Sequence, residues 1–295
     1  MRRAALLLAT LILLAGRAGA APAPPSSALV TLPTGVTLHY AVQGEPGGEP
    51  IVLVHGVGDS WRSWELVMPL LPSRYRVYAI SMRGHGLSDA PQTGYSQKEM
   101  AADITAFMEA LDLRGVTLVG HSLGSFIAQA AAVADRGRLK GLVLVGSGPG
   151  GVPDPAVFAE VKGVFEGLAA DPRGARDFQA STLRRPVPAP FFETMVATLA
   201  GVRPHVWRQI IAAVYDGDTA AALATIKVPT LLVRGEHDAM LSAADQQVLL
   251  AKIPGARLLV YPGTAHTPQW EWPDRFAADL VAFVTGLAKP AAPAR

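Results

Sequence analysis

The stretch Val116-Thr117-Leu118-Val119-Gly120-His121-Ser122-Leu123-Gly124 decides the fold of this chain. The apolar run at residues 116–119 has the composition of a buried β-strand, and a helix-like stretch follows at residues 126–134. The pattern G-x-S-x-G between a strand and a helix is typical of a nucleophile elbow. In such a turn the two glycines let strand and helix approach closely around a serine with a strained backbone. The sequence therefore predicts that the Ser122 hydroxyl projects from the tip of this turn.

Two further predicted strands end in residues that could work together with Ser122. An apolar strand expected at residues 228–233 is followed by Asp238, and a strand expected at residues 257–261 is followed by His266. In a parallel sheet all strands end at the same edge, so side chains just beyond those ends are expected to converge there. A serine, an acid and a histidine that meet in this way can form a nucleophilic triad.

Several motifs at strand ends carry a resemblance to a known family. They are His55-Gly56, Arg83-Gly84-His85-Gly86-Leu87-Ser88, Gly235-Glu236-His237-Asp238 and Gly263-Thr264-Ala265-His266. With the elbow and the chain order serine, acid, histidine, residues 28–287 resemble the α/β-hydrolase superfamily. The resemblance implies an α/β fold, a mostly parallel eight-stranded sheet flanked by helices, with a helical cap inserted over the site. The chain departs from this pattern at Ser81, where many relatives carry an aspartate, so the ion pair made there in relatives is not expected.

The chemistry assigns a role to each predicted residue. Ser122 is a poor nucleophile at neutral pH, so His266 is expected to accept its proton and return it to the leaving group. Asp238 would orient the imidazole and stabilise the imidazolium. The resemblance places the oxyanion hole at the backbone amides of Val57 and Leu123, which would offset the charge of the tetrahedral intermediate.

Other residues compete for these roles. Glu236 stands two residues before Asp238 and could be the acid, although the resemblance places the acid at Asp238. His237 lies between these carboxylates, but no second histidine group with metal-ligand spacing exists, so no metal is expected. The stretch at residues 146–151 satisfies G-x-G-x-x-G, but prolines instead of a helix follow it, so no nucleotide cofactor is expected. The histidines beside glycines at strand ends are expected to hold loops by hydrogen bonds: His55, His85 and His121.

The N-terminal residues predict export. Arg2 and Arg3 precede an apolar run at residues 4–15 and a small-residue site ending at Ala20, as in a secretory signal peptide at residues 1–20. An uncleaved N-terminal anchor is the alternative, but the run is short for a bilayer span, so no stable membrane anchor is expected after cleavage. The mature protein is expected in the periplasm or outside the cell.

Charge and composition narrow the function further. Cleavage would remove three of the 26 basic residues and leave 23 against 24 acidic ones, a net charge of −1 instead of +2, so no nucleic-acid partner is expected. The chain contains no cysteine, which excludes disulfides, a lipoprotein anchor and a thiol nucleophile.

The domain organisation follows from where strands and helices alternate. Residues 21–27 are expected to form a flexible leader, residues 28–150 and 220–288 the hydrolase core, and residues 289–295 a frayed tail. The alternation stops at residues 151–219, which are too many for an ordinary crossover of about a dozen residues and are expected to form the helical cap. Expected pocket-lining residues are Trp61, Met195 and Trp207.

The predicted function is that of a serine hydrolase acting through an acyl-enzyme on a small or medium, mostly uncharged carboxylic ester. Lactone, amide or carbon–carbon bond hydrolysis and perhydrolysis need the same triad and stay as alternatives, as does a non-catalytic small-ligand binder. Members of this fold that use an aspartate nucleophile are disfavoured by Ser122. The sequence predicts neither the substrate nor the oligomeric state.

Overall fold

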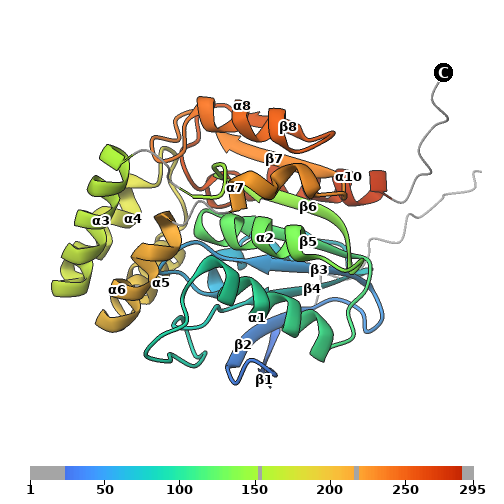
Figure 1. Cartoon of the computed structure of the whole chain (residues 1–295), viewed down its shortest axis with the longest axis horizontal. Helices are drawn as coiled ribbons and strands as arrows, with labels where there is room; N and C mark the ends of the chain where they lie inside the picture. The colour runs from blue at the N-terminus through green and yellow to red at the C-terminus, as the bar shows by residue number, and fades with distance from the viewer. Residues whose placement is uncertain (1–23, 152–154, 216–218, 288–295) are drawn as a thin grey trace, which may run out of the picture.

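The computed structural model describes residues 24–151, 155–215 and 219–287, and its centre is an eight-stranded sheet (Figure 1). The strands are β1 (Ser26–Thr31), β2 (Thr37–Gln43), β3 (Glu49–Val54), β4 (Tyr75–Ile80), β5 (Val116–His121), β6 (Leu139–Val145), β7 (Thr230–Gly235) and β8 (Arg257–Tyr261). Their order is β1-β2-β4-β3-β5-β6-β7-β8. Strands β3 to β8 are parallel, and β2 is antiparallel to both β1 and β4. The predicted α/β fold with a mostly parallel eight-stranded sheet is confirmed.

Helices cover both faces of the sheet. The α-helices are α1 (Gln97–Ala110), α2 (Leu123–Ala134), α3 (Pro155–Ala170), α4 (Ala175–Ser181), α5 (Ala189–Ala200), α6 (Pro204–Tyr215), α7 (Thr219–Ala222), α8 (Ala243–Lys252), α9 (Pro268–Glu271) and α10 (Pro273–Leu287). Short 3₁₀ helices are η1 (Trp61–Trp64), η2 (Met68–Leu70), η3 (Pro172–Gly174) and η4 (Leu223–Thr225). Capping boxes begin α1 at Ser96 and α8 at Ser242, where each serine side chain accepts the N3 amide.

Two hydrophobic cores result from the alternation of side chains along the central strands. Val52 of β3 and Leu118 of β5 face the larger core, which includes residues of α1, α2 and α8. Their neighbours Leu53 and Val119 face a second core that includes residues of α10. Both faces of the sheet are therefore buried, which explains why its strands are continuously apolar.

Helices α3, α4, α5 and α6 lie between β6 and β7 in the chain, where the sequence predicts an insertion. Figure 1 shows them gathered at one end of the sheet, on the left of the view. Helices α3 and α6 pack together through Phe165 and Trp207, whose ring centroids are 5.2 Å apart. All four helices fall within residues 151–219, where the sequence analysis expects a helical cap. We refer to α3–α6 as the cap helices.

The N-terminal leader predicted at residues 21–27 is wrong in its last two residues. Ser26 and Ser27 belong to β1, where they pair with Val42 and Ala41 of β2. Backbone pairing to β2 orders these residues, and it needs no apolar side chain, so the composition conceals the strand. The signal peptide predicted at residues 1–20 and the tail predicted at residues 289–295 lie outside the described residues.

A buried ion pair fixes the loop after β4. Arg83 donates from Nε and Nη2 to the two carboxylate oxygens of Asp103 on α1, at 2.6 and 2.7 Å. Both side chains are more than nine-tenths buried. Because Ser81 carries no charge, the partner of Arg83 comes from α1, and Ser81 instead accepts the amide of Trp61 through its hydroxyl.

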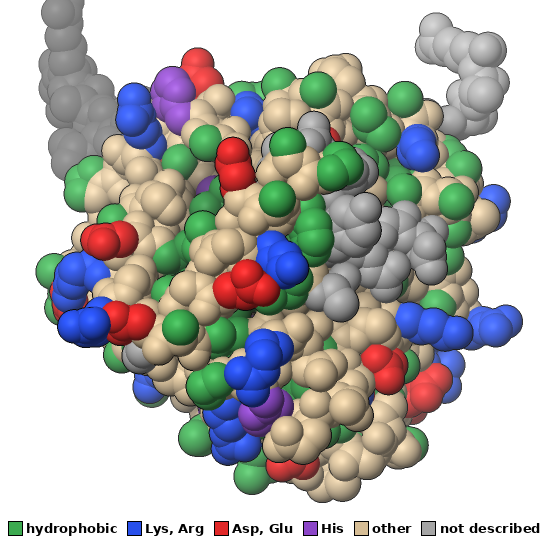
Figure 2. Space-filling view, turned by 60° about the vertical axis from the view of Figure 1, so that its left-hand side comes forward, with side chains coloured by type: hydrophobic (Ala, Val, Ile, Leu, Met, Phe, Trp, Pro, Cys, Tyr) green, Lys and Arg blue, Asp and Glu red, His purple; other side chains and the backbone are tan. Residues whose placement is uncertain are grey.

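Within the described ranges, no helix is both long enough and apolar enough to cross a membrane. On the face shown in Figure 2, basic and acidic side chains are interspersed and not gathered by sign. This distribution matches the nearly balanced charge of the sequence.

Candidate active site

Ser122 forms the turn between β5 and α2, and its backbone is strained. Its φ of 51° and ψ of −123° lie in a region that non-glycine residues rarely adopt. A Cβ on Gly120 would lie 2.3 Å from the Gly124 carbonyl oxygen, and one on Gly124 would lie 2.3 Å from the His55 carbonyl oxygen. The G-x-S-x-G spacing is therefore required by close backbone contact, and the predicted elbow geometry is present.

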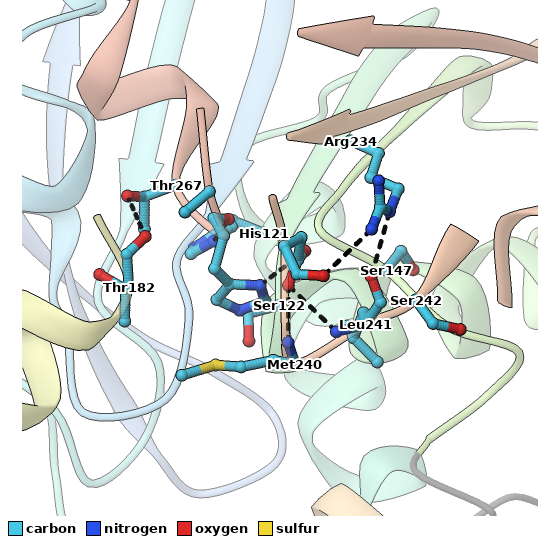
Figure 3. Close-up of polar contacts among 12 residues, drawn as sticks. His121, Ser122, Ser147, Thr182, Arg234, Met240, Leu241, Ser242 and Thr267 are labelled. Carbon is cyan, nitrogen blue, oxygen red and sulfur yellow. Dashed lines mark hydrogen bonds and ion pairs between the residues drawn. The ribbon is translucent and has the colours of Figure 1, made fainter. Parts of the chain in front are cut away.

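His266 and Asp238 are in direct contact. His266 Nδ1 lies 2.9 Å from Asp238 Oδ2, and both side chains are almost completely buried. The other oxygen, Oδ1, accepts the backbone amides of Met240 and Leu241 at 2.9 and 3.0 Å. Figure 3 draws these contacts and those of Arg234, which donates to the Asp238 carbonyl at 3.0 Å. The loop that carries Asp238 is thus held by hydrogen bonds to both its side chain and its backbone.

Glu236, the alternative acid, has a different position. Its side chain is half exposed and accepts the amide of Gly263 at 2.9 Å, with no hydrogen bond to His266. The histidine therefore faces Asp238, as the resemblance implies.

Electrostatics favour a charged pair. Burial by itself would raise the pKa of Asp238, but the charge of His266 and the hydrogen bonds to the carboxylate outweigh burial, and the pKa is lowered. Burial by itself would lower the pKa of His266, but Asp238, and after it Asp59 and Glu271, raise it above the ordinary value. The surroundings of His266 thus stabilise the imidazolium that proton transfer from Ser122 would create.

Ser122 and His266 line the same cavity. Within the described residues no hydrogen bond joins the Ser122 hydroxyl to the imidazole. Such contacts often tighten only when substrate binds.

The predicted oxyanion donors also line this cavity. Leu123 is the first residue of α2, and Val57 follows the His55-Gly56 pair after β3. In the described part of the chain neither amide has a protein acceptor. Two amides at a cavity wall, one of them at a helix N-terminus, suit a developing negative charge.

The three histidines beside glycines hold loops, as predicted. The Nε2 atom of His55 accepts the amide of Met82 at 3.0 Å, and that of His85 accepts the amide of Gly58 at 3.2 Å. His121 Nε2 donates to the His266 carbonyl at 3.0 Å. Burial lowers the pKa of His55 well below its usual range, that of His85 to about 4 and that of His121 to about 3, so all three stay neutral.

The cavity has a volume of about 230 Å³ and is mainly apolar. Cap helices α3 and α4 supply Glu160, Val161, Val164, Phe165, Phe178, Gln179 and Ser181, and the adjoining Thr182 also contributes. Core loops and helices supply Gly56, Val57, Asp59, His121, Ser122, Leu123, Phe126, Ala239, Met240, Leu241, His266, Thr267 and Trp270, and α6 adds Val214. No lysine or arginine occurs among the described residues that line it.

The three residues predicted to line the pocket lie elsewhere. Met195 packs against Phe191 and Trp270 in a small separate core, and Trp207 is buried in the larger core. Trp61 lies on the 3₁₀ helix η1 and lines a second cavity beside α5. The predictions for Met195 and Trp207 are wrong because both side chains pack in these cores, where burial of their apolar surface stabilises the fold. The prediction for Trp61 is wrong because its side chain faces a different cavity.

Two polar wall residues were missed by the sequence analysis. Asp59 stands four residues after His55, and its Oδ1 accepts the side-chain amide of Gln179 on α4 at 3.1 Å. Asp59 lies in the loop between β3 and η1, residues 55–60, which carries Val57 and which we call the oxyanion loop. This position is a local signal that could have identified Asp59. Nothing in the sequence links Gln179 to it, because the two are 120 residues apart.

The cap helices are hydrogen-bonded directly to the loop between β8 and α9, residues 262–267, which carries His266 and which we call the histidine loop. Thr182, at the end of α4, offers its carbonyl oxygen to the His266 amide at 3.1 Å and to the Thr267 hydroxyl at 3.3 Å. The second of these contacts is drawn in Figure 3. The position of the histidine backbone therefore depends on the cap.

Glu271, the last residue of α9, makes a second connection. One carboxylate oxygen accepts the amide of Ala265, and the other accepts those of Arg184 and Arg185, each at 2.7 Å. The side chain is buried, so one carboxylate joins the histidine loop to the segment that connects α4 with α5.

The described residues contain no group of three or more histidine, aspartate or glutamate side chains arranged to hold a metal ion. The sequence of 146–151 does not open a helix directly, because the next helix, α3, begins at Pro155.

Comparison with known proteins identifies the family. The sequence model of the Alpha/beta hydrolase family matches residues 51–279, and the chain belongs to this family. A non-heme chloroperoxidase of Streptomyces lividans is 34% identical over 275 residues, 86% of this chain and 98% of that protein. The 2-hydroxy-6-oxononadienedioate/2-hydroxy-6-oxononatrienedioate hydrolase of Paraburkholderia xenovorans is 28% identical over 84% of this chain and 91% of its own length. Among solved structures, an esterase of Exiguobacterium antarcticum superposes with a TM-score of 0.81 at 26% identity, covering 87% of this chain and 98% of that one.

Proposed function

We propose that this chain is a serine hydrolase that cleaves small or medium, uncharged carboxylic esters through an acyl-enzyme on Ser122. The single observation that carries the proposal is a strained serine on the wall of a cavity that it shares with a histidine bonded to a buried aspartate.

The proposed reaction has two steps. Ser122 Oγ attacks the ester carbonyl while His266 takes the hydroxyl proton, and the collapsing intermediate expels the alcohol, which takes that proton. Water then attacks the acyl-enzyme, again with His266 as base, and releases the acid. Val57 and Leu123 would donate their amides to the oxyanion in both steps.

The cavity wall supports an uncharged substrate. Its ionisable residues besides the two histidines are Asp59 and Glu160, and no lysine or arginine lines it in the described part of the chain. A carboxylate on the substrate would meet no cation to offset its desolvation. This argues against dianionic substrates such as the dienedioates in the name of the Paraburkholderia relative.

The test uses p-nitrophenyl esters of increasing acyl length with the purified protein. Ser122→Ala should lower kcat/KM by about 10³-fold or more, since removal of a triad nucleophile usually costs at least that much. Ser73→Ala, an exposed serine outside the cavity, is the matched control. Hydrolysis by Ser122→Ala at the wild-type rate would refute the proposal. Multiple turnover by the wild type distinguishes an enzyme from a binder that only retains the triad.

Perhydrolysis is the second candidate, favoured by the likeness to a non-heme chloroperoxidase. If hydrogen peroxide replaces water in the second step, the acyl-enzyme yields a peracid. Peracid formation from acetate and hydrogen peroxide, measured on wild type and Ser122→Ala, would reveal this activity. If peracid forms equally with both proteins, this candidate fails.

We also propose that residues 1–20 direct export. Expression of the full chain in a Gram-negative host, followed by N-terminal sequencing of the periplasmic protein, should show Ala21 as the first residue. Retention of all the protein in the cytoplasm with its first residues intact would refute this.

A further inference from the structure

Asp59 is a buried carboxyl group on the wall of the candidate active site. It lies in the oxyanion loop, and only 3% of its surface is exposed. Its hydrogen-bond donors are neutral: the Gln179 side-chain amide at 3.1 Å and the Ser63 hydroxyl at 3.4 Å. Among the described residues, no lysine or arginine forms an ion pair with it.

A buried carboxylate without a counterion is costly, because two neutral hydrogen bonds do not replace its hydration. Burial accordingly raises the pKa of Asp59 to about 7, although the Gln179 and Ser63 hydrogen bonds and His266 act to lower it. Asp59 and His266 line the same cavity, and the charge of each shifts the pKa of the other, lowering that of Asp59 and raising that of His266. The imidazole becomes cationic at the moment when it accepts the serine proton.

Resting on the function proposed above, we infer that Asp59 is a positioning residue that acts through His266. It supplies the imidazolium with a second carboxylate, besides Asp238, from the wall of the cavity that Asp59 and His266 both line. Its counterion forms during the reaction and disappears when the proton leaves. The ionised form of Asp59 therefore stabilises the transition state more than the resting state, which is the condition for acceleration.

The other groups that face His266 do not supply this charge. Asp238 already contacts Nδ1. His121, whose ring centroid lies 5.0 Å from that of His266, is neutral because burial holds its pKa at about 3. Glu271 also acts on His266 by charge, but its carboxylate is bound to three backbone amides.

Asp59→Asn removes the charge and can keep the local hydrogen bonds. Its amide oxygen can accept from Gln179, and its NH₂ group can donate to the Ser63 hydroxyl. Asp177→Asn, on the exposed face of α4, makes the same chemical change outside the cavity and is the matched control.

The experiment measures kcat/KM against pH for p-nitrophenyl acetate, a neutral ester, at the isosbestic wavelength of p-nitrophenol. Without the Asp59 charge the imidazolium is less stable, so His266 releases its proton at lower pH and is a weaker base. We expect the acidic limb of Asp59→Asn to move to lower pH by about half a unit or more. The plateau should fall by about tenfold. The profile of Asp177→Asn should match that of wild type.

Three results would overturn the inference. A lower plateau with an unmoved acidic limb would make Asp59 a merely structural residue. A rise in KM confined to amine-bearing esters would make it a substrate-binding group. Unchanged kinetics would leave it without a role.

An NMR titration of the His266 ring measures its pKa directly and does not depend on enzyme activity. Its pKa should be lower in Asp59→Asn than in wild type, and equal values would overturn the inference. If wild type hydrolyses no ester, the proposed function fails, whereas the NMR comparison still decides the coupling. If Asp59→Asn does not fold, Asp59→Ser, which also removes the charge, takes its place in the NMR comparison, and a His266 pKa equal to that of wild type would contradict the coupling.

Discussion

Replacing Glu271 with alanine should destabilise this protein more than any loss of a surface carboxylate. The buried side chain accepts three backbone amides, each at 2.7 Å. A hydrogen bond to a charged group contributes about 1.5–3 kcal/mol, so the three together are worth at least about 4.5 kcal/mol. Water that enters the vacated space restores part of this, and we expect a loss of about 4 kcal/mol.

The assay is urea unfolding followed by circular dichroism, with a thermal scan beside it. For a chain of this size, about 4 kcal/mol corresponds to a fall in Tm of roughly 8–16 °C. Glu236→Ala is the matched control, because that exposed carboxylate also accepts an amide of the histidine loop, from Gly263 at 2.9 Å. Its loss should cost less than about 1 kcal/mol. If Glu271→Ala costs no more stability than Glu236→Ala, the buried carboxylate does not hold cap and core together.

Glu271→Gln separates the two halves of the connection. Glutamine keeps one acceptor oxygen, and its NH₂ group must face backbone donors on the other side. Stability should lie between wild type and Glu271→Ala. Ester hydrolysis should also fall, since one of the amides belongs to Ala265, the residue before His266.

Three further predictions concern other parts of the fold. Gly124→Ala should lower activity by about 100-fold or more, because its Cβ would lie 2.3 Å from a backbone oxygen. Gly167→Ala in α3, whose Cβ would meet nothing within 4 Å, is the control and should raise the free energy of unfolding by up to about 1 kcal/mol. Similar activities of the two variants would show that the elbow does not need a glycine at 124. Activity should fall as the pH drops through the pKa of His266, because the protonated imidazole cannot accept the serine proton. Asp238 raises this pKa above the ordinary 6.5 against the effect of burial. A rate constant that stays unchanged well below pH 6.5 would exclude a histidine base. Asp103→Asn should cost about 3–5 kcal/mol in urea unfolding, because it leaves Arg83 buried without its counterion, and a loss below about 1 kcal/mol would contradict that reasoning.

The sequence predicted those parts of the site that depend on local geometry. Ser122, Asp238 and His266 each follow a strand of a parallel sheet, and the sheet brings strand ends to one edge whatever the loops contain. The glycines around Ser122 are required by backbone contacts within a few residues, so they too are visible as a motif.

The cavity wall could not be predicted in the same way. Met195 and Trp207 are large and apolar, and the sequence does not reveal whether such a side chain lines a cavity or is buried in a core. Asp59 meets Gln179 only because α4 returns to the oxyanion loop after 120 residues, and no periodicity records that contact. Interactions between the cap and the core thus require the three-dimensional structure.

The Thr182 carbonyl accepts the amide of His266, so the end of α4 is bonded directly to the histidine loop. The cap helices therefore differ in whether they are bonded to that loop. Helix α4 and Thr182 cannot change without moving the histidine, so exchanging them between relatives should damage turnover for every substrate. Helix α3 lines the cavity without a hydrogen bond to the histidine loop in the described residues. If the chain hydrolyses esters as proposed, grafting α3 from a relative should alter acyl preference while the rate on the best ester is retained.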